Sequence, residues 1–296
     1  MGGLLHRAGR DITFLVRPAR AEILRDRGLT IVEPDAEWTI VPNVVAVDEI
    51  DRPFDAILVA VKAYALAEVI DDIAGAVGST TMLLPGLNGM AHIDQLRARF
   101  GDERVLGGAV LVSTTLDGEG RVVHFNASRG GLVYGEFSNR HSPASDELDA
   151  TLQGAGFDAE RSDDIEQAMW DKWVGLAALG ATGCLMRATS GEIAAVPGGA
   201  EVSCAILDEC VAVATAAGFT PSASVVKRSS EMLANPSLQR TTSLYRDLED
   251  GRPVEGEQII GDLVARARQF NVSVPLLALT ATSLAIAQRR RDEVGC

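Results

Sequence analysis

The pattern of hydrophobic and polar positions changes character near the middle of the chain. In the first half, short apolar and β-branched runs alternate with stretches of helical spacing. Strands are predicted over Asp11–Arg17, Phe54–Val61, Thr80–Leu84 and Arg104–Thr114, and helices over Ala19–Arg27, Tyr64–Ala76 and His92–Arg99. Alternation of this kind is typical of a parallel sheet with crossover helices. The continuous apolar run FDAILVAV, which ends at Lys62, predicts a central strand buried on both faces.

Several shorter elements complete this first region. The runs Arg121–Phe125 and Gly131–Gly135 are separated by polar turns and are predicted to be antiparallel additions at the edge of the sheet. A helix over Ser145–Leu152 and a strand over Phe157–Glu160 follow. The acidic segment SDD at 162–164 is predicted to cap the next helix, because serine and aspartate side chains satisfy the free N–H groups of a helix start.

Beyond Ile165 the helical spacing dominates, and strand signals are almost absent. Helices are predicted over Ile165–Leu179, Ala200–Ala217, Ser222–Leu233, Glu255–Phe270 and Leu276–Arg290. A chain of 296 residues exceeds the usual size of one core, so two domains are expected. We therefore expect a nucleotide-binding-like α/β domain over residues 1–163 and an all-α domain over residues 164–296.

Composition narrows the classes of function. The net charge of −14 argues against nucleic acid or an anionic membrane surface as the main partner. No apolar stretch approaches the roughly 20 residues of a membrane-spanning helix, and no signal-peptide layout is present, so the expected location is the cytoplasm. Neither a metal site nor a disulfide framework is predicted, because no CxxC pair or histidine at ligand spacing accompanies the four cysteines, Cys184, Cys204, Cys210 and Cys296.

Cationic side chains are the first candidates for chemistry. The 27 basic residues include only three lysines, Lys62, Lys172 and Lys227, which favours a special role for a lysine that persists. In open α/β sheets ligands bind beyond the carboxyl ends of the strands, where Arg17, Lys62 and Asn88 are expected. An arginine after the first strand suits the 2′-phosphate of NADP, whereas an acidic residue there would suit NAD. Solvated surface roles for Arg17 and Lys62, and a plain turn at Asn88, stay open as alternatives.

Two residues of the second half of the chain are also candidates for chemistry. Lys172 lies between Trp170 and Trp173 in MWDKW, and aromatic neighbours lower the local dielectric, which makes an ammonium easier to deprotonate. Glu255 stands near the start of a predicted helix, where the helix dipole alone favours a carboxylate. The alternative interpretations are a surface lysine paired with acidic neighbours and a dipole-stabilised surface glutamate.

Together these segments resemble the ketopantoate (2-dehydropantoate) reductase family over nearly the whole chain. The resemblance rests on the arginine of FLVRPAR, the lysine of ILVAVKAY, the LNGM segment, the lysine of MWDKW, and Ser243 twelve residues before Glu255 in SLYRDLEDGRPVE. It implies a Rossmann-like N-terminal domain that binds NADPH and a helical C-terminal domain that carries the substrate site. It also implies an oxidoreductase of pantothenate biosynthesis.

For the cofactor, the resemblance implies that Arg17 and Lys62 contact the adenosine phosphate and ribose of NADPH, with Asn88 between nicotinamide and substrate. The family's G-x-G-x-x-G fingerprint is absent from this sequence. The chain opens at MGGLLHRAGR, inside what would be the family's first helix. We therefore expect the functional protein to carry an upstream strand and glycine loop, and the 296-residue form to bind NADPH weakly or not at all.

For the substrate, the resemblance implies that Lys172 is the general acid at the ketone oxygen. An ammonium there stabilises the negative charge that develops and supplies the proton. Ser243 and Glu255 would hold the substrate's hydroxyl and carbonyl ends, and Glu255 is counted with Lys172 as catalytic. Family members commonly carry asparagines four and eight residues after this lysine, where this chain has Leu176 and Gly180, so the exact substrate is left open.

The sequence thus predicts NADPH-dependent reduction of a ketopantoate-like 2-oxo acid to the 2-hydroxy acid, without a metal ion and without a nucleic-acid or membrane partner. Two other classes stay open. One is a dehydrogenase of another small hydroxy or amino acid, and the other is a non-catalytic homologue that binds a ligand without turnover. The assembly is left open between a monomer and a homodimer.

Overall fold

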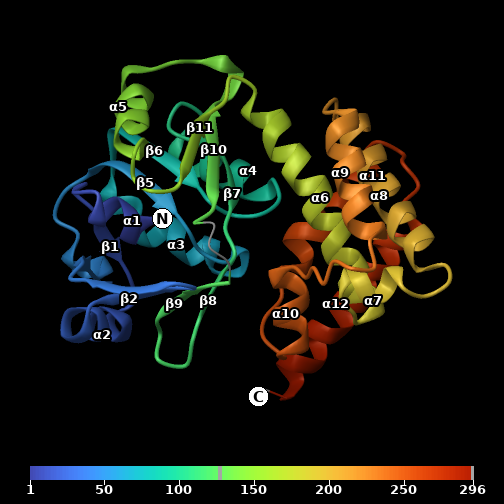
Figure 1. The fold of residues 1–296 in the computed structure, drawn as a ribbon. Helices are drawn as coiled ribbons and strands as arrows, with labels where there is room; N and C mark the ends of the chain where they lie inside the picture. The colour runs from blue at the N-terminus through green and yellow to red at the C-terminus, as the bar shows by residue number, and fades with distance from the viewer. Residues whose placement is uncertain (126–128, 295–296) are drawn as a thin grey trace. The chain divides into compact units, whose positions relative to one another are not determined.

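The chain divides into two compact units in the computed structural model, which describes residues 1–125 and 129–294 (Figure 1). Unit 1 comprises Met1–Val61, Ala65–Leu87 and Ile93–Ile165, and unit 2 comprises Lys62–Tyr64, Asn88–His92 and Glu166–Cys296. The predicted order of an α/β region followed by a helical region is confirmed.

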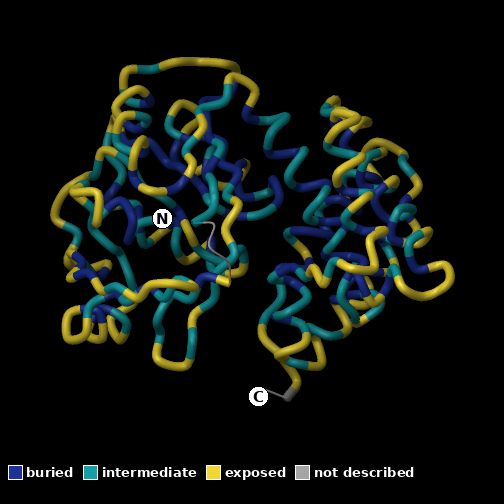
Figure 2. The backbone as a smooth tube through the Cα atoms, viewed as in Figure 1, coloured by how far each residue is buried: buried dark blue, intermediate teal, exposed yellow. Residues whose placement is uncertain are grey.

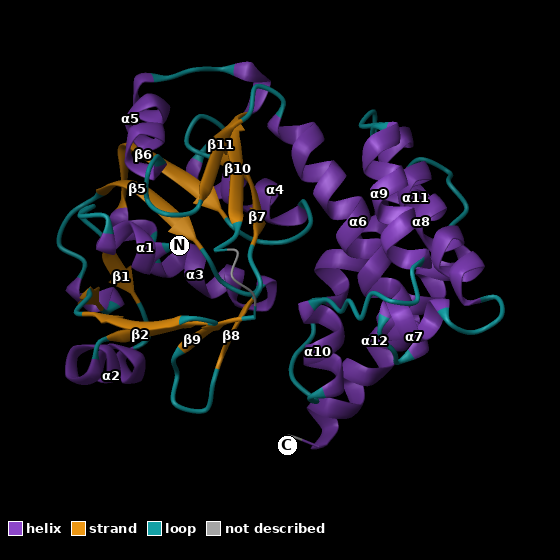
Figure 3. Ribbon diagram, in the orientation of Figure 1, coloured by secondary structure: helices purple, strands orange, loops and turns teal. Residues whose placement is uncertain are grey.

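Strands and helices alternate along the first part of the chain (Figure 3). The strands of its described residues are β1 (Thr13–Leu15), β2 (Leu29–Glu33), β3 (Ala36–Ile40), β4 (Asn43–Val45), β5 (Phe54–Val59), β6 (Val77–Pro85), β7 (Leu106–Leu111), β8 (Thr114–Leu116), β9 (Val122–His124), β10 (Gly131–Glu136) and β11 (Asp158–Arg161). The helices are α1 (Gly2–Arg7), α2 (Pro18–Arg27), α3 (Leu66–Asp72), α4 (Ala91–Phe100) and α5 (Pro143–Leu152).

Strands β5, β6, β7, β10 and β11 form two adjoining sheets with the orders β5-β6 and β11-β10-β7. β5 and β6 are parallel, and a parallel bridge between Leu83 and Val105 brings β6 to the start of β7. β10 lies between β7, which is antiparallel to it, and β11, which is parallel to it. The predicted edge position for Gly131–Gly135 is therefore wrong. The prediction that β5 is buried on both faces is also wrong, since only Val59 of this strand is buried and its one ladder in the described residues is with β6.

A second sheet has the order β3-β2-β9-β8. β2 and β3 form an antiparallel pair that the sequence pattern does not predict. β9 joins β2 in parallel and β8 in antiparallel orientation, so the edge position predicted for Arg121–Phe125 is wrong as well. Strand β1 pairs in parallel with β4.

Helices α1 and α5 cover the β6–β7–β10 surface with apolar side chains. Figure 2 shows the buried stretches of these elements in dark blue. One hydrophobic cluster of unit 1 consists of Leu4, Leu5, Met82, Leu84, Leu106, Leu132, Tyr134, Leu148, Leu152, Ala155 and Phe157.

Unit 2 is built from helices, and in the part of the chain that the structure describes no strand follows β11. These helices are α6 (Ile165–Met186), α7 (Ser190–Ala194), α8 (Gly199–Ala216), α9 (Ala223–Ala234), α10 (Ser243–Glu249), a π-helix (Glu257–Gly261), α11 (Asp262–Gln269) and α12 (Pro275–Val294). Helix α8 contacts α7, α9, α11 and α12, and is therefore the central helix of the unit.

Helix α6 continues past its predicted end at Leu179 because small residues let other segments pack closely against it. A Cβ at Gly180 would lie 3.4 Å from the Leu244 side chain, and one at Gly183 would lie 3.5 Å from Tyr245 Cγ. Glycine lowers helix propensity, so the local sequence suggests an end where the tertiary packing supports a longer helix.

Cys184, Cys204 and Cys210 carry free thiols, and Cys296 lies outside the described residues. Within residues 1–125 and 129–294, no group of three or more His, Cys, Asp or Glu side chains is arranged to hold a metal ion. Among the helices of the same residues, none combines the length and apolar character needed to cross a membrane.

Candidate active site

Two short segments bring predicted site residues into unit 2. Lys62–Tyr64 follows β5, and Asn88–His92 follows β6. Both stand beyond the carboxyl ends of parallel strands, which is where open α/β sheets place their ligand-binding residues. The contacts of these segments are with α6, α10 and the π-helix region.

Lys172 in α6 meets Asn88 from the second of these segments. Its ammonium Nζ donates to Asn88 Oδ1 at 3.0 Å. Burial lowers the pKa of Lys172 from 10.5 to about 8, against the opposing attraction of the Glu255 carboxylate. The neighbouring Trp170 and Trp173 are each 1% exposed and supply dry surroundings. At neutral pH the ammonium is therefore charged, yet close to the pH at which it gives up a proton.

The turn that carries Asn88 is held by the π-helix. Gln258 Nε2 donates to the main-chain oxygen of Asn88 at 3.0 Å and is hydrogen-bonded to His92 Nδ1 at 3.2 Å. Gly89 has a φ of +78°, and a Cβ there would lie 2.6 Å from the main-chain oxygen of Gln258. Only glycine permits such an approach. Burial and the charge on Lys172 lower the pKa of His92 to about 3, so its imidazole is neutral at physiological pH.

A cluster of charges surrounds Lys62. Its ammonium donates to Asp247 Oδ2 at 2.9 Å and to Glu255 Oε2 at 3.1 Å. The other oxygen of Glu255 accepts from the Ala63 N–H at 3.0 Å, and the other oxygen of Asp247 accepts from Arg252 at 2.9 Å. Burial alone would lower the pKa of Lys62, but the nearby carboxylates outweigh it and raise this pKa above its ordinary value.

The last two predicted site residues make different contacts. Ser243 is the first residue of α10 and stands one turn before Asp247 on the same helix face. Arg17 is the N-cap residue of α2 in unit 1 and donates to Glu68 at 2.7 Å, with both side chains mostly exposed. The other five predicted site residues all belong to unit 2.

These contacts place a proton donor, Lys172, within electrostatic reach of Glu255 in the charge cluster around Lys62. Lys172 uses one of its three donor hydrogens on Asn88, which leaves two for an oxygen atom of a ligand. Its pKa responds to Glu255, so the two groups interact electrostatically. A lysine with a lowered pKa beside a specific charge partner is a candidate for general acid catalysis.

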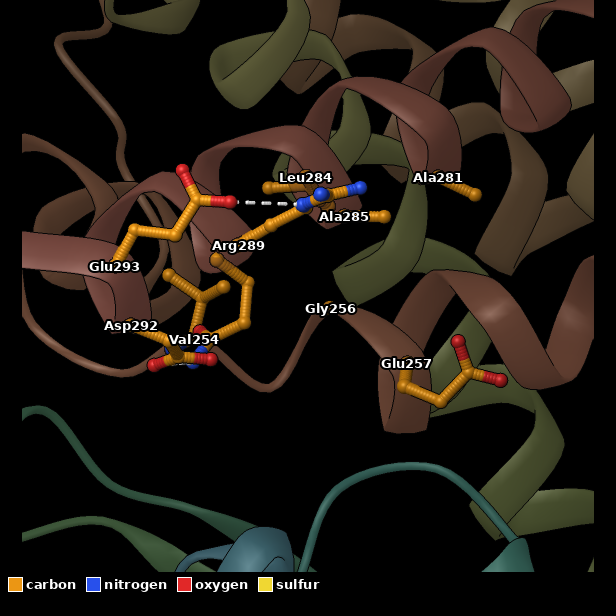
Figure 4. Close-up of a pocket in the computed structure, with 10 residues that line it drawn as sticks. Val254, Gly256, Glu257, Ala281, Leu284, Ala285, Arg289, Asp292 and Glu293 are labelled. Atoms are coloured by element: carbon orange, nitrogen blue, oxygen red, sulfur yellow. Dashed lines mark hydrogen bonds and ion pairs between the residues drawn. The ribbon is translucent and has the colours of Figure 1, made fainter.

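A separate pocket of about 750 Å³ opens between the start of the π-helix and the part of α12 from Ala281 onward (Figure 4). No predicted site residue is among the described residues that line it. Arg289 in its lining is held by Glu293 at 2.9 Å, and Glu257 and Asp292 add negative charge. An acidic lining does not suit an anionic acid as ligand, so this pocket is not the candidate active site.

Three contributing residues are missed by sequence reasoning: His92, Asp247 and Gln258. Asp247 stands one helical turn after Ser243 in α10, and His92 and Gln258 stand four and three positions after Asn88 and Glu255. That spacing is the signal that could have found them.

Comparison with known proteins gives the family context. A family model described as "Ketopantoate reductase PanE/ApbA" matches residues 1–139, and one described as "Ketopantoate reductase PanE/ApbA C terminal" matches residues 164–288. "Uncharacterized oxidoreductase YkpB" of Bacillus subtilis is 30% identical over 284 residues, which is 96% of this chain and 93% of that protein.

Solved structures share the architecture. A 2-dehydropantoate 2-reductase from Geobacter metallireducens matches with a TM-score of 0.86 at 28% identity, over 97% of this chain and 95% of that chain. A D-mandelate dehydrogenase solved with NADH and anilino(oxo)acetate matches with a TM-score of 0.87 over 98% and 95% of the two chains. Its identity is 19%, so this likeness shows the fold alone.

Proposed function

This chain belongs to the ketopantoate reductase PanE/ApbA family of oxidoreductases, and we propose that it catalyses the NADPH-dependent reduction of a 2-oxo acid to the 2-hydroxy acid. The observation that carries the proposal is the Lys172 ammonium, held on Asn88 with a pKa near 8. A positioned acid with such a pKa is suited to protonate an oxygen near neutral pH.

Lys172 is the general acid in this proposal. When NADPH is bound, its reduced nicotinamide supplies the hydride to the ketone carbon. Negative charge then develops on the ketone oxygen, and the ammonium of Lys172 stabilises that charge and transfers its proton to the oxygen. The neutral amine that remains takes a proton from solvent before the next turnover. Asn88 keeps the ammonium in place throughout, because its Oδ1 accepts one of the three hydrogens.

Glu255 and Ser243 are proposed to hold the polar ends of the substrate. Glu255 is fixed by Lys62 and by the Ala63 N–H, so its carboxylate is already oriented before a substrate arrives. Preorganised groups of this kind contribute to catalysis because no reorganisation is needed at the moment of reaction. Ser243 stands on the face of α10 that carries the same cluster.

Arg17 fits the 2′-phosphate of NADPH. It stands directly beyond β1, and its pair with Glu68 is exposed, so the pair contributes at most about 1 kcal/mol and gives way to a doubly charged phosphate. Lys62 is neutralised by two carboxylates, so a contact with the adenosine phosphate or ribose stays a prediction. Asn88 retains its side-chain N–H₂ group for nicotinamide or substrate, since its bond to Lys172 uses Oδ1.

A dehydrogenase of another 2-hydroxy acid is the second candidate function, and the face of α6 favours it. Leu176 and Gly180 follow Lys172 by one and two helical turns, and neither side chain offers a hydrogen bond. A 2-oxo acid with an apolar side chain therefore suits this face better than one that ends in a hydroxyl.

The test is a screen of NADPH oxidation with 2-oxo acids that carry polar, aliphatic or aromatic side chains, ketopantoate among them. Each is assayed with NADPH and with NADH, with Lys172→Met as the control. Turnover of ketopantoate supports the first function, and preferred turnover of an apolar 2-oxo acid supports the second. Ligand binding without turnover refutes both and identifies a non-catalytic homologue.

A further inference from the structure

We infer that Gln258 is a positioning residue for the general acid: its side-chain amide fixes the Asn88 turn, and His92 in turn fixes Gln258. This inference rests on the proposed role of Lys172. Gln258 does not contact Lys172 itself, and it acts through Asn88, whose Oδ1 holds the ammonium.

The direction of the hydrogen bonds follows from one contact. The atom of Gln258 that lies 3.0 Å from the main-chain oxygen of Asn88 must be the amide nitrogen, because a carbonyl oxygen only accepts. The same nitrogen therefore donates its second hydrogen to His92 Nδ1 at 3.2 Å. His92 then carries its proton on Nε2. Both hydrogens of the Gln258 amide are thus used to hold one turn of the chain.

The π-helix places Gln258 at this turn. A π-helical stretch is a rare and weakened form of helix that occurs frequently at functional sites. In this one, the main-chain oxygen of Ile259 accepts a hydrogen bond from the indole nitrogen of Trp173 at 3.0 Å. Trp173 directly follows Lys172 in α6. The contacts therefore close a ring that begins and ends on neighbouring residues of α6: Trp173, Ile259, Gln258, Asn88 and Lys172.

The stability of the folded protein alone does not explain why a histidine occupies position 92. It is fully buried, and no atom of the described residues accepts a hydrogen bond from its Nε2. A buried donor without a partner is unfavourable, and an apolar side chain of similar size would avoid this loss. The contact that the imidazole does make is with Gln258, so its contribution lies in the orientation of that amide.

The ring has a consequence for the proton affinity of Lys172. The groups described around its ammonium are Asn88, the neutral imidazole of His92 and the carboxylate of Glu255. Asn88 Oδ1 accepts only while the amine carries a hydrogen in that direction, and a bond to the charged form favours that form. Loosening the Asn88 turn therefore weakens the bond and lowers the pKa of Lys172 further.

The test measures the pKa of Lys172 directly by NMR on protein with isotope-labelled lysine. The chain has only three lysines, so the Lys172 signal is assigned by its loss in Lys172→Met. The variants are Gln258→Met, His92→Leu and Asn88→Ala, and Gln269→Met, at an exposed end of α11, is the matched control. We expect the pKa of Lys172 to fall in the first three variants and to stay unchanged in Gln269→Met.

Steady-state kinetics and melting temperatures of the same variants provide a second test. We expect Gln258→Met to lower kcat/KM about ten- to a hundredfold, and the double variant with Asn88→Ala to be no slower than Asn88→Ala alone, since both changes break one chain of contacts. His92→Leu should lower kcat/KM while its melting temperature is unchanged or higher. A folded Gln258→Met variant with an unchanged Lys172 pKa, or with losses additive to those of Asn88→Ala, overturns the inference. Full turnover by Lys172→Met overturns the proposed function instead, and the two failures are thereby distinguished.

Discussion

Replacing Lys172 by methionine should separate activity from stability. Methionine matches the lysine side chain as far as Cε and lacks the ammonium. A general acid contributes about 10²- to 10⁴-fold to turnover, so with the proposed role of Lys172 kcat should fall by that factor while NADPH affinity changes little. The same change should stabilise the fold near neutral pH, because a partly buried charge is removed.

The size and sign of the stability change follow from the pKa of Lys172. Its fall from 10.5 to about 8 corresponds to roughly 3.4 kcal/mol, which is the order of magnitude of the cost of burying the charge. Below about pH 8 Lys172 carries its proton in both the folded and the unfolded protein, so the full destabilisation from burying its charge is present. Between about pH 8 and 10.5 the unfolded chain binds more protons, and the wild-type protein gains stability as the pH rises.

The assay is urea unfolding of the wild type and Lys172→Met at about pH 7 and about pH 10, together with steady-state kinetics of both proteins. The variant should be the more stable protein at the lower pH, and this advantage should shrink at the higher pH. A variant with near-normal turnover, or a stability difference that is the same at both pH values, would refute the reasoning.

Three further substitutions test other parts of the site. Arg17→Ala should weaken NADPH binding about ten- to a hundredfold and leave NADH unaffected, and an unchanged cofactor preference would contradict this. Glu255→Ala should raise KM far more than it lowers kcat, so a wild-type KM would count against its role. Gly89→Ala should destabilise the protein by about 1–3 kcal/mol beyond Gly9→Ala, which has the same φ of +78° but no atom within 4 Å of the position that a Cβ would take. Equal losses in the two alanine variants would show that backbone strain, and not the approach to Gln258, sets the cost.

The fold could be predicted from the sequence where local pattern determines structure. Helix α8 spans Gly199–Ala216 against a prediction of Ala200–Ala217, because its apolar positions repeat at helical spacing. The π-helix lies inside the predicted helix Glu255–Phe270, since hydrophobic spacing does not distinguish the two helix types over one turn. The placement of β9 between β2 and β8 depends on pairing between distant segments, which no local pattern encodes.

In the candidate site, too, the sequence indicates single residues but not the contacts between distant segments. Lys172 and Asn88 could be singled out by composition, strand ends and family resemblance, but their hydrogen bond joins residues 84 positions apart. The pairing of Lys62 with Asp247 and Glu255 is invisible in the sequence for the same reason, so the sequence alone suggests a free charge at Lys62. Gln258 gives no signal of its own because an isolated glutamine on a helix is most often solvated.

The most direct test of the account is to titrate Lys172 by NMR and compare its pKa with the pH dependence of kcat/KM for ketone reduction. A general acid must carry its proton, so kcat/KM should be constant below the pKa and fall above it. One of the three lysines should titrate at about 8, and kcat/KM should break at the same pH. A Lys172 that titrates near its ordinary value of 10.5, or a kcat/KM without a break between 8 and 10.5, would contradict the proposed role of Lys172.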